Sequence, residues 1–267
     1  MVRFAGGVAV VTGAASGLGA GLVTQAARLG MRVALADIDT DAIRSRTREL
    51  EREGVDALWC EVDVRSHDDV AALADAVYRR WDGTTVLINN AGLELCGNTW
   101  ELPVERWRQV VDVNLNGVFN GISAFVPRMV SDSTPSAVVN VCSVAALRVG
   151  PGSSAYSATK HACLALTESL ALELAESAPQ VRATAVLPGL VRSRIFDSAF
   201  VADEDGIGAR SRARYAASMA EKGLEADDAA RIIFDGVARG ELRVHTHPEV
   251  SRSYIAERAR ALALPEE

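Results

Sequence analysis

Short apolar runs rich in β-branched residues alternate with longer amphipathic stretches along most of this chain of 267 residues. Several of the runs are continuously apolar, which is typical of strands buried on both faces of a parallel sheet. The amphipathic stretches between them have the length of crossover helices, and this alternation favours right-handed βαβ units. We therefore expect an α/β fold, with a doubly wound parallel sheet of about seven strands and helices on both faces.

The pattern sets the expected boundaries of these elements. The expected strands are Val8–Val11, Arg32–Ala36, Ala57–Val62, Val86–Asn89, Ala137–Val141, Arg182–Leu187 and Arg243–His245. The expected helices are Gly17–Leu29, Asp41–Glu53, Ser66–Trp81, Val104–Met129, Ala155–Ala175 and Asp227–Arg239. We expect residues 1–267 to form a single domain. Residues 189–224 show neither pattern, and because so long an irregular connection is commonly functional, we expect a substrate lid there.

Charge and composition exclude several classes of partner. The net charge of −7 argues against nucleic acid and against an anionic membrane surface, which both attract basic proteins. Residues 5–27 carry no charge, but six glycines and several polar residues distinguish them from a signal peptide or a membrane span. The four cysteines lack the spacing of metal ligands, so we expect buried free thiols, no metal and a cytoplasmic location.

A glycine-rich turn follows the first expected strand, with the sequence Thr12-Gly-Ala-Ala-Ser-Gly-Leu-Gly19. Glycines at a strand-to-helix turn allow the backbone to approach a phosphate closely. The helix that follows offers free N–H groups and the positive end of its dipole to an anion. The spacing G-x-x-x-G-x-G therefore predicts a dinucleotide-binding turn, although a tight turn without a ligand has the same composition.

Two acidic residues follow the next strands. Asp37 comes 18 residues after Gly19, close to where dinucleotide folds place a carboxylate on the adenosine ribose. A solvated helix-capping aspartate is the alternative interpretation. Asp63 follows the third strand, where it is suitably placed for the adenine ring, and it is equally suited to cap the next helix.

The most specific signal is Tyr156-Ser-Ala-Thr-Lys160. A tyrosine and a lysine at positions i and i+4 share one face of a helix. An ammonium stabilises phenolate and so lowers a tyrosine pKa, and a positioned tyrosine exchanges protons with an alcohol or a carbonyl. The chain contains only two lysines, so a lysine four residues after a tyrosine is not expected by chance. Ser143 ends the fifth strand, where its hydroxyl is expected to point into a ligand crevice.

Taken together, these motifs resemble the short-chain dehydrogenase/reductase family along nearly the whole chain. The motifs are Thr12-Gly-x-x-x-Gly-x-Gly19, Asn89-Asn-Ala-Gly92, Asn114, Ser143, Tyr156-x-x-x-Lys160 and Pro188-Gly189. They occur in the order and at the spacing of the family, which implies a Rossmann-like sheet and a nicotinamide cofactor, here NAD. The implied cofactor-binding residues are Gly13, Ser16, Gly17, Leu18, Gly19, Asp37, Asp63, Val64, Asn90, Ala91, Gly92, Tyr156, Lys160, Pro188, Gly189, Val191 and Ser193.

The resemblance also implies roles for the catalytic residues. Tyr156 would be the general acid and base, and Lys160 would lower its pKa and hold the nicotinamide ribose. Ser143 would bind the substrate oxygen. Asn114 would hold a water in a proton relay from Lys160, at a local break in the helix 104–129. Ser193 stands where the family more often has threonine, a mild departure that keeps the hydroxyl.

Assembly is the next expectation. The helices expected at 104–129 and 155–175 carry apolar residues on more than one face, and a helix that is apolar nearly all round must be buried. One face would cover the sheet and the other would meet a symmetry mate. The resemblance implies a homotetramer built partly on this helix pair.

Other candidate residues are weaker. His245 and His247 lie near the last strand without a cysteine partner, and we expect a structural or interface role rather than metal binding. Glu94 follows the Asn-Asn-Ala-Gly segment, where it could enter a pocket, but we expect it at the surface. Arginines 210, 212 and 214 could meet an anionic substrate, although a solvated helix face is the simpler expectation.

The expected reaction is NAD-dependent hydride exchange with a secondary alcohol or its ketone, which defines a short-chain alcohol dehydrogenase. Apolar residues in the expected loops favour a hydrophobic substrate, such as a cyclic, steroid-like or terpenoid alcohol; they are Leu147, Val149, Leu190, Ile195 and Phe196. A 3-oxoacyl-carrier-protein reductase is the alternative, but such enzymes usually take NADPH and present a basic docking patch. A non-catalytic NAD-binding sensor would not need Tyr156, Lys160 or Ser143.

Overall fold

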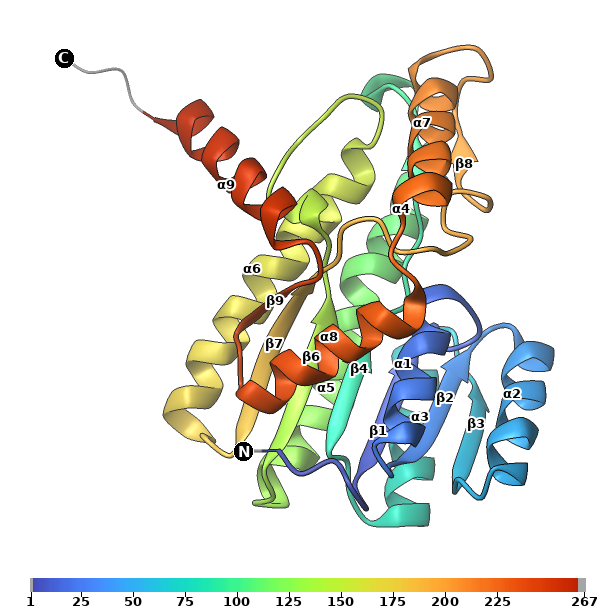
Figure 1. Cartoon of the computed structure of the whole chain (residues 1–267), viewed down its shortest axis with the longest axis vertical. Coiled ribbons are helices and arrows are strands. Elements are labelled where there is room, and N and C mark those ends of the chain that lie inside the picture. Colours follow the sequence, from blue (N-terminus) through green and yellow to red (C-terminus); the bar gives the residue numbers. More distant parts are fainter. Residues whose placement is uncertain (1, 264–267) are drawn as a thin grey trace.

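The computed structural model describes residues 2–263, and its centre is a parallel sheet of seven strands in the order β3-β2-β1-β4-β6-β7-β9 (Figure 1). Every neighbouring pair in this sheet is parallel. The expected doubly wound parallel sheet is therefore confirmed. The strands are β1 Val8–Thr12, β2 Arg32–Asp37, β3 Ala57–Glu61, β4 Val86–Asn89, β6 Ser136–Val141, β7 Val181–Leu187 and β9 Arg243–His245.

Helices cover both faces of this sheet. One face carries α1 Gly17–Arg28, α2 Thr40–Arg52 and α8 Ala226–Arg239, and the other carries α3 His67–Trp81, α5 Gly117–Ser131 and α6 Ser154–Ser177. Side chains of β1 alternate between two cores: Ala9 and Val11 pack in the first, and Val8 and Val10 in the second. All five residues of β1 are buried, so the strand is covered on both sides, as the apolar run Val8–Val11 predicts.

The helix expected at 104–129 is interrupted. It consists of α4 Val104–Val111, a π-helical turn at Asp112–Asn116 and α5. A π-helical turn inserts one extra residue into a helix and is frequent at functional sites. Asn114 lies within the turn and is fully buried, so the break falls where the family resemblance implied it.

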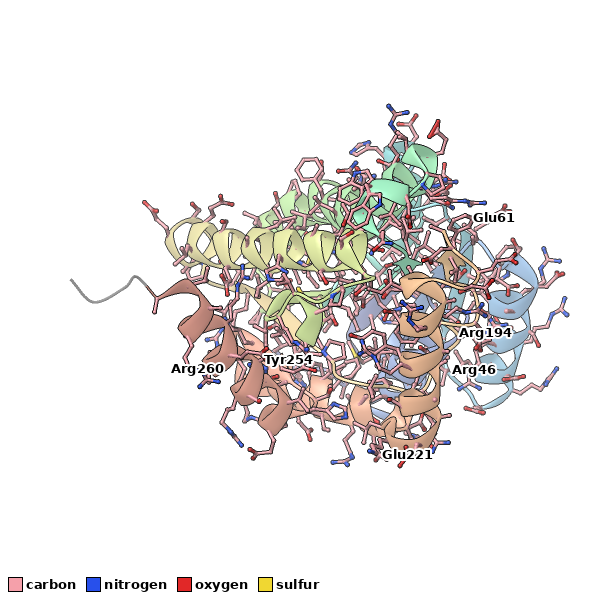
Figure 2. All side chains as sticks on the ribbon, turned by 90° about the horizontal axis from the view of Figure 1, so that it is seen from above. Arg46, Glu61, Arg194, Glu221, Tyr254 and Arg260 are labelled. Atoms are coloured by element: carbon pink, nitrogen blue, oxygen red, sulfur yellow. The ribbon has the colours of Figure 1, made fainter. Side chains whose placement is uncertain are left out.

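The expectation for residues 189–224 was wrong in one respect, because 16 of its 36 residues form a helix. It contains β8 Phe200–Val201 and the helix α7 Ile207–Lys222. β8 pairs in parallel with β5, Leu95–Cys96, to form a second, two-stranded sheet. A last helix, α9 Pro248–Leu262, was also not expected. It begins with a proline in its first turn and extends away from the sheet (Figure 1), and Figure 2 shows from above that it projects from the rest of the molecule.

The strand order positions the site. The chain runs outward from β1 through β2 to β3, then returns to β4 on the other side of β1, so the order reverses between β1 and β4. In open α/β sheets, ligands bind at the carboxyl ends of the strands at such a switch point. Within residues 2–263, no helix is long and apolar enough to cross a membrane.

Candidate active site

A cavity of about 1310 Å³ lies at the carboxyl ends of the central strands. Its lining residues come from the glycine-rich turn, from the ends of β2, β3, β4, β6 and β7, and from α6 and α7. All but one of the sequence-predicted site residues line it. These are Gly13, Ser16, Gly17, Leu18, Gly19, Asp37, Asp63, Val64, Asn90, Ala91, Gly92, Ser143, Tyr156, Lys160, Pro188, Gly189, Val191 and Ser193. The exception is Asn114, which is buried behind the wall.

The glycine-rich turn has the geometry of an anion cradle. Gly13 and Gly17 have positive φ angles of 64° and 52°, which side chains rarely adopt, and a Cβ on Gly19 would overlap the carbonyl oxygen of Gly13. Ser16 precedes α1 and makes no side-chain cap, so the first N–H groups of the helix are open to a ligand. The Asn90 side chain holds the turn from below, with Nδ2 donating to the carbonyls of Thr12 (2.9 Å) and Gly13 (3.1 Å).

Asp37 stands beside this turn at the end of β2. Its Oδ2 accepts a hydrogen bond from the Ala15 backbone N–H at 2.9 Å, and its Oδ1 accepts one from the Asp39 N–H at 3.0 Å. Asp37 therefore does not cap α2, because Asp39 does so by accepting from the Ala42 N–H. This leaves the Asp37 carboxylate fixed at the cavity wall next to the cradle.

Asp63 is also placed at the cavity and not at a helix cap. The cap of α3 is Ser66, whose hydroxyl accepts from the Asp69 N–H at 3.2 Å. Asp63 instead pairs with Arg65, with 2.9 Å between Arg65 Nε and Asp63 Oδ1. The adjacent guanidinium lowers the pKa of Asp63. The carboxylate is thus already engaged by its own neighbour.

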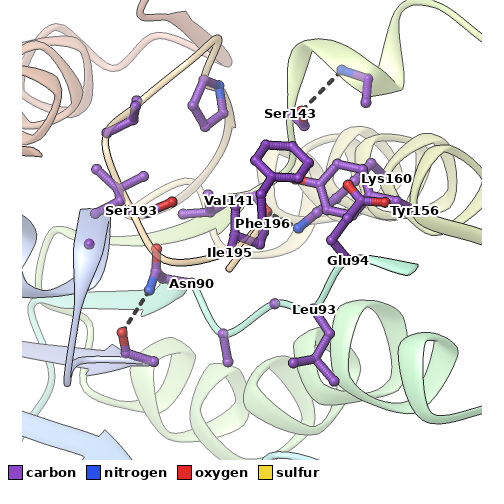
Figure 3. Close-up of a pocket in the computed structure, with 18 of the residues that line it drawn as sticks. Asn90, Leu93, Glu94, Val141, Ser143, Tyr156, Lys160, Ser193, Ile195 and Phe196 are labelled. Carbon is purple, nitrogen blue, oxygen red and sulfur yellow. Dashed lines mark hydrogen bonds between the residues drawn. The ribbon is translucent and has the colours of Figure 1, made fainter. Parts of the chain in front are cut away.

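Ser143, Tyr156 and Lys160 meet at the other end of the cavity (Figure 3). Ser143 lies two residues after the end of β6, and its hydroxyl accepts a hydrogen bond from the Ala145 N–H at 3.0 Å. Tyr156 and Lys160 lie one turn apart on α6, and the ammonium is 5.5 Å from the centre of the tyrosine ring. Lys160 is buried, with Nζ donating to the Val141 carbonyl at 2.8 Å.

The pKa of Tyr156 differs from the expectation. It is raised above 10.0, because burial disfavours the phenolate more strongly than its neighbours favour it. The Lys160 ammonium lowers the pKa, as the sequence predicts, and a hydrogen bond with Ser143 lowers it further, but the two together do not outweigh burial. Before the reaction, Tyr156 is therefore a protonated phenol. The Lys160 ammonium stabilises the phenolate and so reduces the free energy that its ionisation costs.

Asn114 ties the π-helical turn to the site from behind. Its Oδ1 accepts from the Leu93 N–H at 2.8 Å, and its Nδ2 donates to the Leu93 carbonyl at 2.9 Å and to Thr159 Oγ1 at 3.2 Å. One side chain thus connects the chain leaving β4 to α6, next to Lys160. The Asn114 side chain therefore holds the cavity wall in place. Its role in a proton relay stays a prediction.

The segment after β7 closes over the glycine-rich turn. The Pro188 carbonyl accepts from the Val144 N–H at 2.9 Å, and the Gly189 N–H donates to Thr246 Oγ1 at 3.0 Å. A Cβ on Gly17 would contact Ser193, so Ser193 lies directly against the turn. His247 lines the cavity next to Gly189, and its Nδ1 bonds to Thr246 Oγ1.

The three arginines of α7 have different environments. Arg212 fastens the preceding loop, with Nε donating to the Phe196 carbonyl at 2.8 Å and Nη2 donating to the Asp197 carbonyl at 3.3 Å. Arg210 donates to the Asp205 carbonyl at 3.1 Å, whereas Arg214 lines the cavity. The expectation of a solvated helix face is therefore wrong for the half-buried Arg212, whereas Arg210 and Arg214 are exposed as expected. Phe196, which Arg212 holds, stacks on Tyr215 with ring centres 5.4 Å apart.

Glu94 contradicts its expected surface position. The residue is only 6% exposed and lines the cavity at the catalytic end. Burial raises the pKa of its carboxyl to about 8, and the opposing effects are the hydrogen bond from the Leu95 N–H and the charge of Lys160. The apolar Leu95 and Cys96 that follow it are a signal for this burial, because they form β5 inside the molecule.

The cysteines and His245 lie outside the catalytic end of the cavity or play structural roles. Cys96, Cys142 and Cys163 are buried free thiols as expected, whereas Cys60 is partly exposed. Cys142 and Cys163 lie in contact, with 3.4 Å between their sulfur atoms. His245 bonds through Nδ1 to Ser251 at 2.8 Å, which joins β9 to α9.

Comparison with known proteins assigns the class. The family model for the short-chain dehydrogenases matches residues 7–204, and the chain belongs to this family of oxidoreductases. A curated oxidoreductase, SadH of Mycobacterium tuberculosis, is 33% identical over 91% of this chain and 87% of its own length. The 1-deoxy-11-beta-hydroxypentalenate dehydrogenase of Streptomyces exfoliatus is 39% identical over 68% of this chain and 66% of its own.

A solved structure extends the likeness to the whole fold. The short-chain dehydrogenase/reductase from Burkholderia phymatum, determined in complex with NAD, superposes with a TM-score of 0.92. It shares 29% sequence identity, and the alignment covers 100% of this chain and 99% of that one. The sequence-based assignment to the family is therefore confirmed.

Proposed function

We propose that this protein is an NAD-dependent dehydrogenase that exchanges a hydride between the nicotinamide and a secondary alcohol or its ketone. The observation that carries the proposal is the layout of one cavity. An anion cradle with a carboxylate beside it lies at one end, and Ser143, Tyr156 and Lys160 lie at the other. A dinucleotide in an extended conformation joins two such ends.

The residues present fit such a cofactor. The glycine cradle and the open N–H groups of α1 suit a pyrophosphate, and Asp37 suits the two hydroxyls of the adenosine ribose. Lys160 and Tyr156 would hold the nicotinamide ribose, and the segment Pro188–Ser193 would seat the carboxamide. When bound, the nicotinamide supplies the carbon that accepts or donates the hydride.

The side chains of the protein supply the proton transfer. In the oxidation direction, Tyr156 first releases its own proton to solvent, and the phenolate then accepts the proton of the substrate hydroxyl, while Ser143 donates a hydrogen bond that stabilises the alkoxide as it forms. Lys160 stabilises the phenolate that this step requires. In the reduction direction, Tyr156 returns the proton to the carbonyl oxygen. Ser143 then holds that oxygen in the same position.

The proposed choice of NAD over NADP rests on Asp37. NADP carries an additional phosphate on the adenosine ribose, with close to two negative charges. The fixed Asp37 carboxylate would repel it, and no basic side chain immediately follows, since Ile38 and Asp39 come next. The solved relative with NAD bound supports the same choice.

The substrate is proposed to be mostly hydrophobic. Residues that line the catalytic half of the cavity include Leu93, Val144, Val149, Ile195 and Phe196. Such a wall favours a cyclic, steroid-like or terpenoid alcohol. The pentalenate relative, whose name describes a hydroxylated substrate, supports this class. Residues 189–224 would act as the lid, and we propose a cytoplasmic homotetramer.

A panel of secondary alcohols tests the proposal. Each alcohol is incubated with NAD⁺, and reduced cofactor is followed by its absorbance. We expect turnover with at least one hydrophobic secondary alcohol, and loss of it in Tyr156→Phe. If the panel gives no reduced cofactor in the direction of oxidation and the matching ketones give no oxidation of NADH, the proposed function is overturned.

A further inference from the structure

Glu94 is a buried carboxyl that the proposed reaction does not use. It follows the β4 segment and directly precedes β5, which pairs with β8 and fixes the backbone at this point. Figure 3 shows its side chain reaching toward the part of the cavity where Tyr156 and Lys160 lie. Within residues 2–263, the only hydrogen bond to this carboxyl comes from the adjacent Leu95 N–H, at 3.2 Å.

A purely structural role does not account for this residue. A buried carboxyl is costly to desolvate unless it is well paired, and one bond from its own neighbour satisfies one of its two oxygens. The positive charge of Lys160 lowers the pKa of this carboxyl, but the Lys160 ammonium already donates to the Val141 carbonyl. An apolar side chain would fill the space at less cost. The second oxygen of this carboxyl therefore has no hydrogen-bond partner among the described residues, and a ligand in the cavity can supply one.

The protonation state narrows the chemistry of that ligand. Because burial raises the pKa of Glu94 to about 8, the group is mainly a neutral carboxylic acid at pH 7. A neutral carboxyl donates one hydrogen bond and accepts others. A hydroxyl has the same pair of capacities, so the two groups complement each other. A cationic amine fits less well, because Lys160 already places a positive charge at this end of the cavity.

We propose that Glu94 is a specificity-determining residue that binds a second hydroxyl of the substrate, close to the reacting carbon. The preferred substrates are then diols, or hydroxyketones in the reverse direction, on an apolar frame. The apolar side chains around Glu94 hold that frame, and Ser143 and Tyr156 hold the oxygen that reacts. This inference rests on the proposed function and deepens it.

Matched pairs of alcohols test the inference. Each pair differs by one hydroxyl: cyclohexanol with trans-1,2-cyclohexanediol, and 1-indanol with 1,2-indanediol. The measured quantity is the ratio of kcat/KM for the diol to kcat/KM for the mono-alcohol, with NAD⁺ at pH 7. We expect the unmodified protein to prefer the diol at least tenfold in one pair, because a site built to bind a hydroxyl rejects the analogue that lacks it.

Variants then assign the preference to one side chain. Glu94→Leu should reduce the ratio to near one, and Glu94→Gln should retain much of it, because the amide still donates and accepts. Glu105→Leu replaces an exposed carboxyl on α4 and should leave the ratio unchanged. Circular dichroism melting curves establish that each variant is folded. If Glu94→Leu does not fold, Glu94→Ala takes its place, with the same expected ratio near one.

The outcomes separate the two proposals. A ratio near one in the unmodified protein, or an undiminished ratio in Glu94→Leu, overturns the role of Glu94 while the dehydrogenase function stands. A better efficiency with trans-2-aminocyclohexanol than with the diol also overturns it, in favour of a carboxylate that binds a cation. If no alcohol in these pairs reduces the cofactor while other alcohols of the panel do, the role of Glu94 is overturned and the dehydrogenase function stands. If the whole panel and the matching ketones are silent, the proposed function fails, and the role of Glu94 fails with it.

Discussion

At the scale of single residues, Tyr156 is the group on which the proposed chemistry depends. Tyr156→Phe keeps the ring in its place on α6 and removes the proton that is exchanged. We expect kcat to fall by roughly 10²–10⁴, the usual contribution of general acid–base catalysis. The affinity for NAD⁺, measured by isothermal titration calorimetry, should change little, since the cradle and Asp37 are untouched. Turnover close to that of the unmodified protein would contradict the mechanism.

Coenzyme preference is a second property that single residues decide. The Asp37 carboxylate is held by two backbone N–H groups at 2.9 and 3.0 Å, so it cannot easily turn away from an added phosphate. We expect kcat/KM with NAD⁺ to exceed that with NADP⁺ by at least ~100-fold, which corresponds to ~2.8 kcal/mol.

The double change Asp37→Ser with Ile38→Arg should narrow or reverse this preference, because it removes the repulsion and supplies a cation. Steady-state kinetics with both coenzymes measure the effect. Equal or better efficiency of the unmodified protein with NADP⁺ would show that Asp37 does not face the ribose.

The buried carboxyl of Glu94 predicts a pH dependence of stability. Its pKa is about 8 in the folded protein and 4.5 without the fold. Between these values the folded chain holds a proton that the unfolded chain has released, so the free energy of unfolding falls as the pH rises. The fall should level off above the folded pKa. Urea unfolding at pH 5, 6, 7 and 8 should show a shallower fall in Glu94→Gln, and parallel curves for the two proteins would contradict the assignment.

At the scale of elements, the sequence predicts the helices and strands that bury an apolar face. All seven strands of the main sheet and five of the six expected helices are present, with ends that differ by a few residues, and the sixth, at 104–129, is divided by the π-helical turn. α7 and α9 were missed because they bury few large apolar side chains, and periodicity detects only an apolar stripe. The alanine- and arginine-rich composition of α7 is a propensity signal that could have identified it.

The same reasoning applies to the site. Most cavity residues that belong to a sequence motif were predicted. The reason is that a backbone close to a phosphate requires glycine, and proton transfer by a tyrosine requires a lysine one helical turn away. Glu94 was placed at the surface, since burial of a carboxyl opposes the general distribution of charged residues. The raised pKa of Tyr156 depends on burial, which local spacing does not reveal.

The loop fastened by α7 gives a prediction at this scale. Arg212 donates to two consecutive carbonyls of the loop that carries Phe196 into the cavity wall. Arg212→Ala should loosen this loop and raise the KM for the alcohol by about tenfold, since hydrogen bonds from a charged group contribute roughly 1.5–3 kcal/mol. Arg210→Ala removes a neighbouring exposed arginine and is the control. Equal KM values in the two variants would show that Arg212 does not position the loop.

At the scale of the whole molecule, the outer surfaces of α5 and α6 indicate association. Phe119 on α5 is 55% exposed and Leu172 on α6 is 75% exposed, although both helices pack their other faces on the sheet. Large apolar side chains on long helices are costly to leave in water, and a symmetric partner would cover them. We expect multi-angle light scattering at micromolar concentration to give a mass four times that of one chain.

Charge placed on this surface should break the assembly. In Phe119→Glu with Leu172→Glu, every copy would bring like charges into a symmetric contact, and burial of an unpaired carboxylate is strongly unfavourable. We expect the light-scattering mass to fall to that of a smaller species, while circular dichroism retains the spectrum of the folded chain. Ala213→Glu adds the same charge on the exposed side of α7 and should leave the mass unchanged. A single-chain mass for the unmodified protein would show that α5 and α6 do not form an interface.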